Sequence, residues 1–297
     1  MLLLTDTAHT ACVPWGPFTV QWSLDDATVL QELLADWPRR PVGGAADVRI
    51  SARARTIASS RRYFYSLPHV RTEVSNETMT FSFGNALRAT WRVNMAEMDC
   101  VYETGWTHPK ARLLTAALPW LLATWMAQHD RFLLHASAVV TDGRADLFVG
   151  PSGVGKTTIA SSVDPGRVVH DEAVFVERVA GSTYVSSGEW HRHAAATPGM
   201  RWPLHRICLL TREGAIGLQP IGRAEALSSL LACTFYNVPG TPQWYRRRLE
   251  VVGQWVEQYP CYHLRYRLHQ DDVWQWLMPG RCAQTPDSMV GVTTGGA

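Results

Sequence analysis

The sequence predicts an α/β protein built in two parts and followed by a tail. Residues 47–102 form short segments of alternating polarity separated by turn residues, which is typical of strands. Residues 147–160 combine an apolar strand, a glycine-rich loop and the start of a helix. We therefore expect a small, mostly antiparallel α+β domain over residues 1–108, an α/β domain over residues 109–282, and a disordered tail over residues 283–297.

Composition and charge exclude several classes of protein. The chain has 297 residues, of which 46% are hydrophobic and 18% charged, as in soluble globular proteins. A formal net charge of +2 without a long basic run argues against a nucleic-acid partner. The most apolar run, residues 113–127, is shorter than a membrane span and contains Pro119, so we expect no membrane association. Six scattered cysteines without a C-x-x-C pair indicate reduced thiols and a cytoplasmic location.

Hydrophobic periodicity gives the order of the elements. In the first part we expect a strand over residues 18–22 and then a helix to about Trp37, which Ser23, followed by Asp25 and Asp26, caps. The second part begins with a helix over residues 109–128. A hairpin over residues 132–149 then leads into the loop. Downstream, the pattern predicts strands over 167–177, 183–190, 207–210, 216–220 and 262–268, and helices over 223–235, 244–258 and 271–278.

The loop over residues 150–158 fits the pattern G-x-x-x-x-G-K-[ST], which is typical of nucleoside triphosphate binding. Its glycines let backbone N–H groups face phosphate oxygens, and the following helix adds its dipole. We expect Lys156 to reach the β and γ phosphates and the Thr157 hydroxyl to hold Mg²⁺. The predicted nucleotide-binding residues are Gly150, Ser152, Gly153, Val154, Gly155, Lys156, Thr157 and Thr158.

Lysine usage supports this interpretation independently. Of 28 basic residues only Lys110 and Lys156 are lysines, and all others are arginines. An ammonium group fits between phosphates where a planar guanidinium does not, so a lysine retained at this position indicates a phosphate contact.

Two acids follow the loop closely. Asp171 and Glu172 come fourteen and fifteen residues after Thr157, on the next predicted strand, which returns them to the loop after one short helix. One carboxylate would bind Mg²⁺ together with Thr157, and the other would accept a proton from an attacking hydroxyl. A solvated pair of acids at a strand end is the alternative.

Other candidate residues are a histidine and several arginines. His135 lies in an apolar run on the strand paired with the one that enters the loop, where it would neutralise γ-phosphate charge or tune a neighbouring acid. A histidine satisfied within the core is the alternative. Arg192 and Arg201 are candidates for phosphate or substrate contacts. The run Arg246, Arg247 and Arg248 on a predicted helix indicates a solvated face, with contact to an acidic substrate as the alternative.

The motifs together resemble a known family. Residues 134–139, the loop 150–158 and residues 171–174 resemble the catalytic domain of HPr kinase/phosphorylase. Residues 203–207 followed by 223–227 resemble HPr-kinase-related serine kinases found beside peptide-tailoring genes, including lasso-peptide kinases. The resemblance extends over roughly residues 132–277.

The resemblance implies a mixed sheet of the PEP carboxykinase type. It also implies that Asp171 is the catalytic base or acid, that Glu172 is a Mg²⁺ ligand, and that His135 is catalytic. Two features depart from the family pattern. The second acid is a glutamate instead of the usual aspartate, and the Gly-rich signature of true HPr kinases has no counterpart around residues 181–199. The second departure argues against HPr as the acceptor and against phosphorylase activity.

The sequence thus predicts a kinase that uses ATP and Mg²⁺ to phosphorylate a hydroxyl, most simply a serine of a peptide or small protein. Its catalytic residues would be Asp171, His135 and Lys156. One alternative is a kinase of the same fold that acts on an amino acid or a sugar. Another is a regulatory protein that binds nucleotide without phosphoryl transfer. Assembly into a homo-oligomer is left open.

Overall fold

A computed structural model describes most of the chain. The described residues are 8–15, 17–37, 43, 45–55, 70–75, 78–83, 86–92, 96–103, 110–187, 200–212, 217–234, 242–267 and 273–277. The expected boundary between residues 108 and 109, the expected tail over 283–297, and the candidate Arg192 lie outside them.

The N-terminal part is a seven-stranded sheet with the order β1-β2-β3-β7-β6-β5-β4. Four of its six strand pairings are antiparallel, in agreement with the predicted mostly antiparallel sheet, and β2–β3 and β3–β7 are parallel. The strands are β1 (His9–Trp15), β2 (Phe18–Leu24), β3 (Val48–Arg55), β4 (Val70–Val74), β5 (Thr78–Phe83), β6 (Leu87–Arg92) and β7 (Glu97–Glu103).

The parallel pair β2–β3 follows from the helix that joins its strands. Parallel neighbours need a crossover connection, and α1 (Ala27–Asp36) provides it. Asp26 caps this helix, because its Oδ1 accepts from the backbone N–H of Thr28 at 2.9 Å and of Val29 at 3.3 Å. The predicted cap, Ser23, is wrong, because Ser23 still belongs to β2 and Asp26 occupies the cap position. The crossover that begins at Asp26 explains the parallel register.

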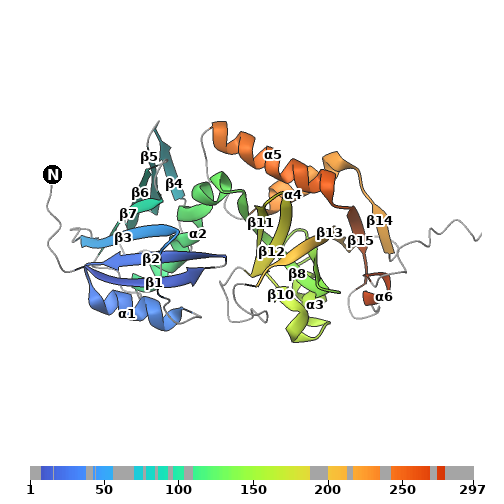
Figure 1. Ribbon diagram of the computed structural model, residues 1–297, viewed down its shortest axis with the longest axis horizontal. Helices are drawn as coiled ribbons and strands as arrows, with labels where there is room; N and C mark the ends of the chain where they lie inside the picture. Colours follow the sequence, from blue (N-terminus) through green and yellow to red (C-terminus); the bar gives the residue numbers. More distant parts are fainter. Residues whose placement is uncertain are drawn as a thin grey trace, which may run out of the picture.

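A long helix, α2 (Lys110–Gln128), connects the two sheets. Its buried face, which includes Leu118 and Trp125, packs in the same hydrophobic core as the N-terminal sheet. Leu133 and Phe175, which belong to the second sheet, also contribute to that core, and Figure 1 shows α2 between the two sheets. No helix among the described residues is long and apolar enough to cross a membrane.

The C-terminal part is an eight-stranded mixed sheet, as the sequence predicts for an α/β protein (Figure 1). Its strands are β8 (Arg131–Thr141), β9 (Arg144–Val149), β10 (Val168–His170), β11 (Ala173–Val179), β12 (Ser182–Ser187), β13 (Trp202–Thr211), β14 (Gly217–Pro220) and β15 (Cys261–Arg265). Its helical segments are α3 (Lys156–Ser161), η1 (Pro165–Arg167), α4 (Arg223–Cys233), α5 (Pro242–Gln258) and α6 (Trp274–Leu277).

Strand β9 lies at the centre of this part. It pairs with β8 in the predicted hairpin and with β13 in parallel, and β13 pairs in parallel with β15. Leu147 and Val149 pack into a core with residues of α4 and α5, whereas Phe148 packs on the opposite face with residues of α3 and α6. Burial on both faces explains why the strand reads as a continuous apolar run.

One predicted element is wrong in a way that matters for function. The single strand expected over residues 167–177 is two strands, β10 and β11, interrupted at Asp171 and Glu172. The ring of His170 causes the interruption, because its Nδ1 accepts from the backbone N–H of Glu172 at 3.0 Å and of Ala173 at 2.9 Å. These two N–H groups point to the ring, and the two acids therefore lie on a bend beside β8.

Candidate functional site

The predicted loop leaves the sheet between β9 and α3. Gly153 and Gly155 have φ angles of +76° and +114°, which side-chain-bearing residues rarely adopt. A Cβ on Gly155 would lie 1.8 Å from the Tyr266 hydroxyl oxygen, so the close approach of this tyrosine requires glycine there. The conformation of the loop thus depends on glycine at Gly155, which the sequence pattern requires, and at Gly153, which is a variable position of that pattern.

Three strands hold the loop in place through polar contacts that the sequence did not indicate. From β8, the Ser137 hydroxyl donates to the Lys156 carbonyl at 3.1 Å. The Arg212 guanidinium, directly after β13, donates to the Gly153 carbonyl, and the Tyr266 hydroxyl, directly after β15, donates to the Val154 carbonyl at 3.1 Å. The carboxyl ends of parallel strands meet at one edge of a sheet, but only the topology shows that β13 and β15 are parallel to β9.

Lys156 is buried at the start of α3, with 5% of its surface exposed. Its ammonium group donates to the carbonyls of Gly150 at 2.9 Å and Pro151 at 3.0 Å, both in its own loop. Burial lowers the pKa of Lys156, while Cys233 and Glu172 act in the opposite direction. The lysine is therefore a buried cation held by neutral carbonyls.

His135 lies beside this lysine, as expected from the hairpin. Ala136 pairs with Val149, so His135 is opposite the first residue of the loop, and on its other edge it pairs with Ala173. Burial lowers the pKa of His135, the nearby Lys156 charge lowers it further, and Glu172 opposes both effects. The structure therefore brings His135, Lys156 and Glu172 together, and the imidazole is neutral at neutral pH.

The two acids differ in exposure. Glu172 is exposed, whereas the Asp171 side chain is 18% exposed and its Oδ1 lies 3.6 Å from the His170 Nδ1. That nitrogen accepts two backbone hydrogen bonds, so the ring proton of a neutral His170 is on Nε2. The contact with Asp171 is then not an ion pair, and the carboxylate keeps its capacity to accept a proton.

Cys233, at the end of α4, is a further neighbour of the loop that sequence analysis missed. Burial raises the pKa of its thiol, while a hydrogen bond from the Gly150 backbone and the charge of Lys156 oppose that shift. A lone cysteine far along the chain gives no sequence signal of this proximity. The described cysteines, which exclude Cys282, are all free thiols, in agreement with the expectation from their spacing.

Arg201 is not brought to the loop. It lies next to the first residue of β13, whereas the loop lies at the other end of β9, which runs parallel to β13. Its Nε is 2.7 Å from the Glu177 carboxylate, which also binds Arg131 at 3.1 Å. The predicted phosphate contact of Arg201 therefore needs correction, because a buried carboxylate holds this guanidinium elsewhere.

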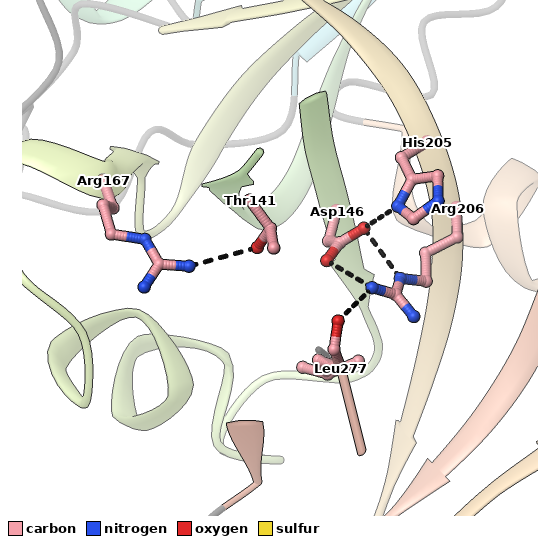
Figure 2. Close-up of polar contacts among 6 residues, drawn as sticks. All are labelled: Thr141, Asp146, Arg167, His205, Arg206 and Leu277. Carbon is pink, nitrogen blue, oxygen red and sulfur yellow. Dashed lines mark hydrogen bonds and ion pairs between the residues drawn. The ribbon is translucent and has the colours of Figure 1, made fainter. Parts of the chain in front are cut away.

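Another polar cluster surrounds Asp146 near the start of β9. Figure 2 shows its carboxylate between His205, at 2.9 Å, and Arg206, whose Nε and Nη2 lie at 2.8 and 3.0 Å. The same guanidinium donates to the Leu277 carbonyl at 2.5 Å and so ties α6 to the sheet. This cluster is a closed, structural ion-pair network.

The predicted Mg²⁺ ligands have suitable chemistry. The Thr157 hydroxyl and the carboxylates of Asp171 and Glu172 are hard oxygen donors, which Mg²⁺ prefers. No group of three or more His, Cys, Asp or Glu residues that could hold a metal occurs within the described residues. Mg²⁺ in nucleotide sites is commonly bound by one or two carboxylates together with phosphate oxygens, so this donor set fits the ion.

Comparisons with known proteins give little further information. No protein-family model matches the sequence, and no curated protein matches it. Among solved structures, the chain is similar to the HPr(Ser) kinase/phosphatase from Coxiella burnetii, with 12% sequence identity and a TM-score of 0.26. The match covers 45% of this chain and 85% of that one.

Proposed function

We propose that this protein is an ATP-dependent kinase that transfers the γ-phosphoryl group to a hydroxyl, with serine of a peptide or small protein as the expected acceptor. The observation that carries the proposal is the grouping of His135, Lys156 and Glu172 around a glycine-dependent loop between a strand and a helix. That combination supplies what phosphoryl transfer requires: backbone N–H groups that bind phosphate, a positive charge, an oxygen ligand for a metal, and side chains that donate or accept protons.

The loop would bind the triphosphate through its backbone N–H groups and Lys156. The ammonium group now donates to two carbonyls of the loop and would turn to phosphate oxygens, which are far better acceptors because they are charged. Ser137, Arg212 and Tyr266 fix the loop by contacts to its carbonyls, which leaves backbone N–H groups for the ligand.

Thr157 and the residues across from the loop would bind the metal and accept the proton of the acceptor hydroxyl. Thr157 and Glu172 would hold Mg²⁺, which when bound supplies charge neutralisation to the phosphates. The Asp171 carboxylate would accept the proton of the acceptor hydroxyl as the new oxygen–phosphorus bond forms and the bond to the β–γ bridging oxygen breaks. His135, which is neutral because of its lowered pKa, would donate a hydrogen bond to the γ-phosphate.

The test measures transfer of labelled γ-phosphate from MgATP to serine-containing peptides by purified protein. Asp171→Asn removes the proposed base with little change in shape, so we expect the rate to fall by about 10²–10⁴-fold. The control is Asp142→Asn, which makes the same exchange in the exposed turn between β8 and β9. Full activity in a normally folded Asp171→Asn protein would refute the assignment of the base.

A further inference from the structure

Arg248 is a buried cation for which the described protein provides no counter-charge. It lies on α5 with 8% of its surface exposed, and its Nη2 donates to the Leu231 carbonyl and the Thr234 hydroxyl. Its Nε has no hydrogen-bond partner, and no carboxylate among the described residues pairs with it. Its neighbour Arg247 is different, because both of its nitrogens Nε and Nη2 bind the Asp130 carboxylate at 2.7 Å.

An unpaired buried charge is costly, so its presence needs a reason. Burial lowers the pKa of Arg248, but an arginine stays protonated at any physiological pH. The guanidinium lies 5.4 Å from the centre of the Trp244 ring, which compensates only part of the lost hydration. A cation in this situation is stabilised strongly by an anion that reaches it.

Arg248 lines a small cleft that an anion could enter. The cleft is shallow and partly open to solvent, with an inner volume of only about 10 Å³, so an anion would bind at its mouth. Its walls come from α2, the start of β8, the residue after α4 and α5, and are formed by Ala123, Met126, Arg131, Phe132, Leu133, Thr234, Trp244 and Arg248. The apolar side chains in this set favour a group with a short hydrocarbon stem, since a phosphate would place several oxygens against apolar walls.

The charges around the cleft are unbalanced in favour of positive charge. Arg131 and Arg201 share one carboxylate, Glu177, whose pKa is raised by its burial although both arginines oppose the shift. Arg131 therefore shares its carboxylate with a second arginine, and Arg248 has no carboxylate partner among the described residues. The cleft would attract one further negative group.

The position of the cleft links it to the phosphate loop. Strand β9 covers the edge of β8 only as far as Ala136, and the chain then turns into the loop opposite His135. Beyond that point Thr234 forms a β-bridge with Leu134, and Arg131 and Leu133 line the cleft. Cys233, the residue before Thr234, contacts Gly150 at the start of the loop. The cleft therefore lies along the same strand as His135, which follows Leu133 by two residues.

We infer that this cleft is a carboxylate-binding subsite for the phosphoryl acceptor, with Arg248 as its central residue. The inference rests on the proposed kinase function for the role of the bound molecule, but not for the anion site itself. The carboxylate can come from an acidic side chain of a peptide or from a small hydroxy acid. In either case Arg248 places the acceptor hydroxyl beside His135 and the bend that carries Asp171.

The first experiment tests the anion site without requiring transfer. Melting temperatures of the wild type, Arg248→Gln and Arg246→Gln are measured with increasing sodium propionate, against sodium chloride at equal ionic strength. Arg246 is exposed on the same helix and serves as the matched control. We expect saturable stabilisation by propionate in the wild type and in Arg246→Gln that is absent in Arg248→Gln. No propionate effect in the wild type, or an equal effect in Arg248→Gln, would overturn the subsite.

A second variant covers the case in which Arg248→Gln does not fold. Arg131→Gln removes a cation from another wall of the cleft, and we expect it to weaken propionate binding as well. Unchanged propionate stabilisation in a folded Arg131→Gln protein would contradict the charge excess on which the inference depends.

The second experiment tests the acceptor role. Transfer from MgATP is compared for serine peptides that carry Glu or Gln at the same position, and for glycerate as a small hydroxy acid. We expect KM for the acidic acceptor to be lower by about tenfold in the wild type, and this advantage to be lost in Arg248→Gln. The acceptor role would be overturned by equal KM values for the Glu and Gln peptides, together with a KM for glycerate that is no lower than that of the Gln peptide. Propionate binding without transfer to any acceptor would refute the kinase function and leave the anion site standing.

Discussion

The two ends of strand β9 carry polar clusters of opposite character. Near its start, Asp146 is fully buried and bound by His205 and Arg206, so each charge has a protein partner at hydrogen-bond distance. After its end, Lys156 is also buried, yet it donates to the neutral carbonyls of Gly150 and Pro151. The same strand thus leads from a closed ion-pair network to a cation whose hydrogen bonds go to neutral carbonyls.

This difference separates structural polar groups from binding groups. A charge paired within the protein stabilises the fold and has little to gain from a ligand. A buried cation held by neutral groups gains much from an anion, since neutral acceptors compensate its lost hydration only in part. The same criterion distinguishes Arg247, which binds Asp130, from Arg248, which binds a carbonyl and a hydroxyl.

Breaking the closed cluster should give the largest effect on stability. Arg206→Met leaves the buried Asp146 with His205 as its partner and removes the contact to Leu277. We expect the free energy of unfolding, measured by urea denaturation, to fall by about 3–5 kcal/mol. Arg144→Met, an exposed position on β9, the strand of Asp146, is the control and should change stability by less than about 0.5 kcal/mol. Similar losses in the two variants would show that the cluster is not structural.

Disrupting the loop that follows β9 should affect ligand binding more than disrupting the Asp146 cluster near the start of β9. Gly155→Ala introduces a side chain where φ is +114° and where a Cβ would collide with the Tyr266 hydroxyl. Gly143→Ala has a similar backbone strain, with φ of +74°, but no atom within 4 Å of the added Cβ. We expect Gly143→Ala to cost about 1 kcal/mol of unfolding free energy and Gly155→Ala clearly more, with weaker MgATP binding only in the latter. Equal costs would mean that Tyr266 does not confine the loop.

A smaller effect on stability is expected from a change of pH, through the protonation of His135 beside the loop. Because the pKa of His135 is lowered in the folded state, the unfolded chain takes up its proton first as the pH falls below about 6.5. The wild type should therefore lose stability relative to His135→Asn between about pH 7 and pH 5. Unfolding free energies of both proteins across this range provide the check. A wild type that gains stability relative to the variant would mean that a nearby acid outweighs burial and the Lys156 charge in setting the pKa of His135.

Local sequence signals predicted the elements that depend on neighbours in the chain. The first helix, the hairpin into the loop and the strand–loop–helix order around Lys156 all follow from periodicity and glycine placement, and the structure has them. The break at Asp171 and Glu172 was missed, because the ring of His170 competes with the strand for two backbone N–H groups. No pattern in the sequence predicts that the His170 ring competes with the strand for these N–H groups.

Contacts between distant segments could not be predicted from the sequence. The strands that bring Arg212 and Tyr266 to the loop are neighbours of β9 only in the folded sheet. Arg246, Arg247 and Arg248 look alike in the sequence, where a solvated face was the simplest interpretation. Packing of α5 against α2 and α4 buries Arg248, pairs Arg247 and leaves Arg246 exposed, so identical side chains have three different environments.

The most direct test of the central claim is calorimetric titration of the wild type and Lys156→Met with MgATP. Methionine has a similar length and volume, so the fold should be retained while the cation is lost. We predict saturable binding of one nucleotide by the wild type, and affinity at least about tenfold lower in Lys156→Met with nearly unchanged unfolding free energy. No binding by the wild type, or equal affinity in the folded variant, would contradict the assignment of the loop as a nucleotide site.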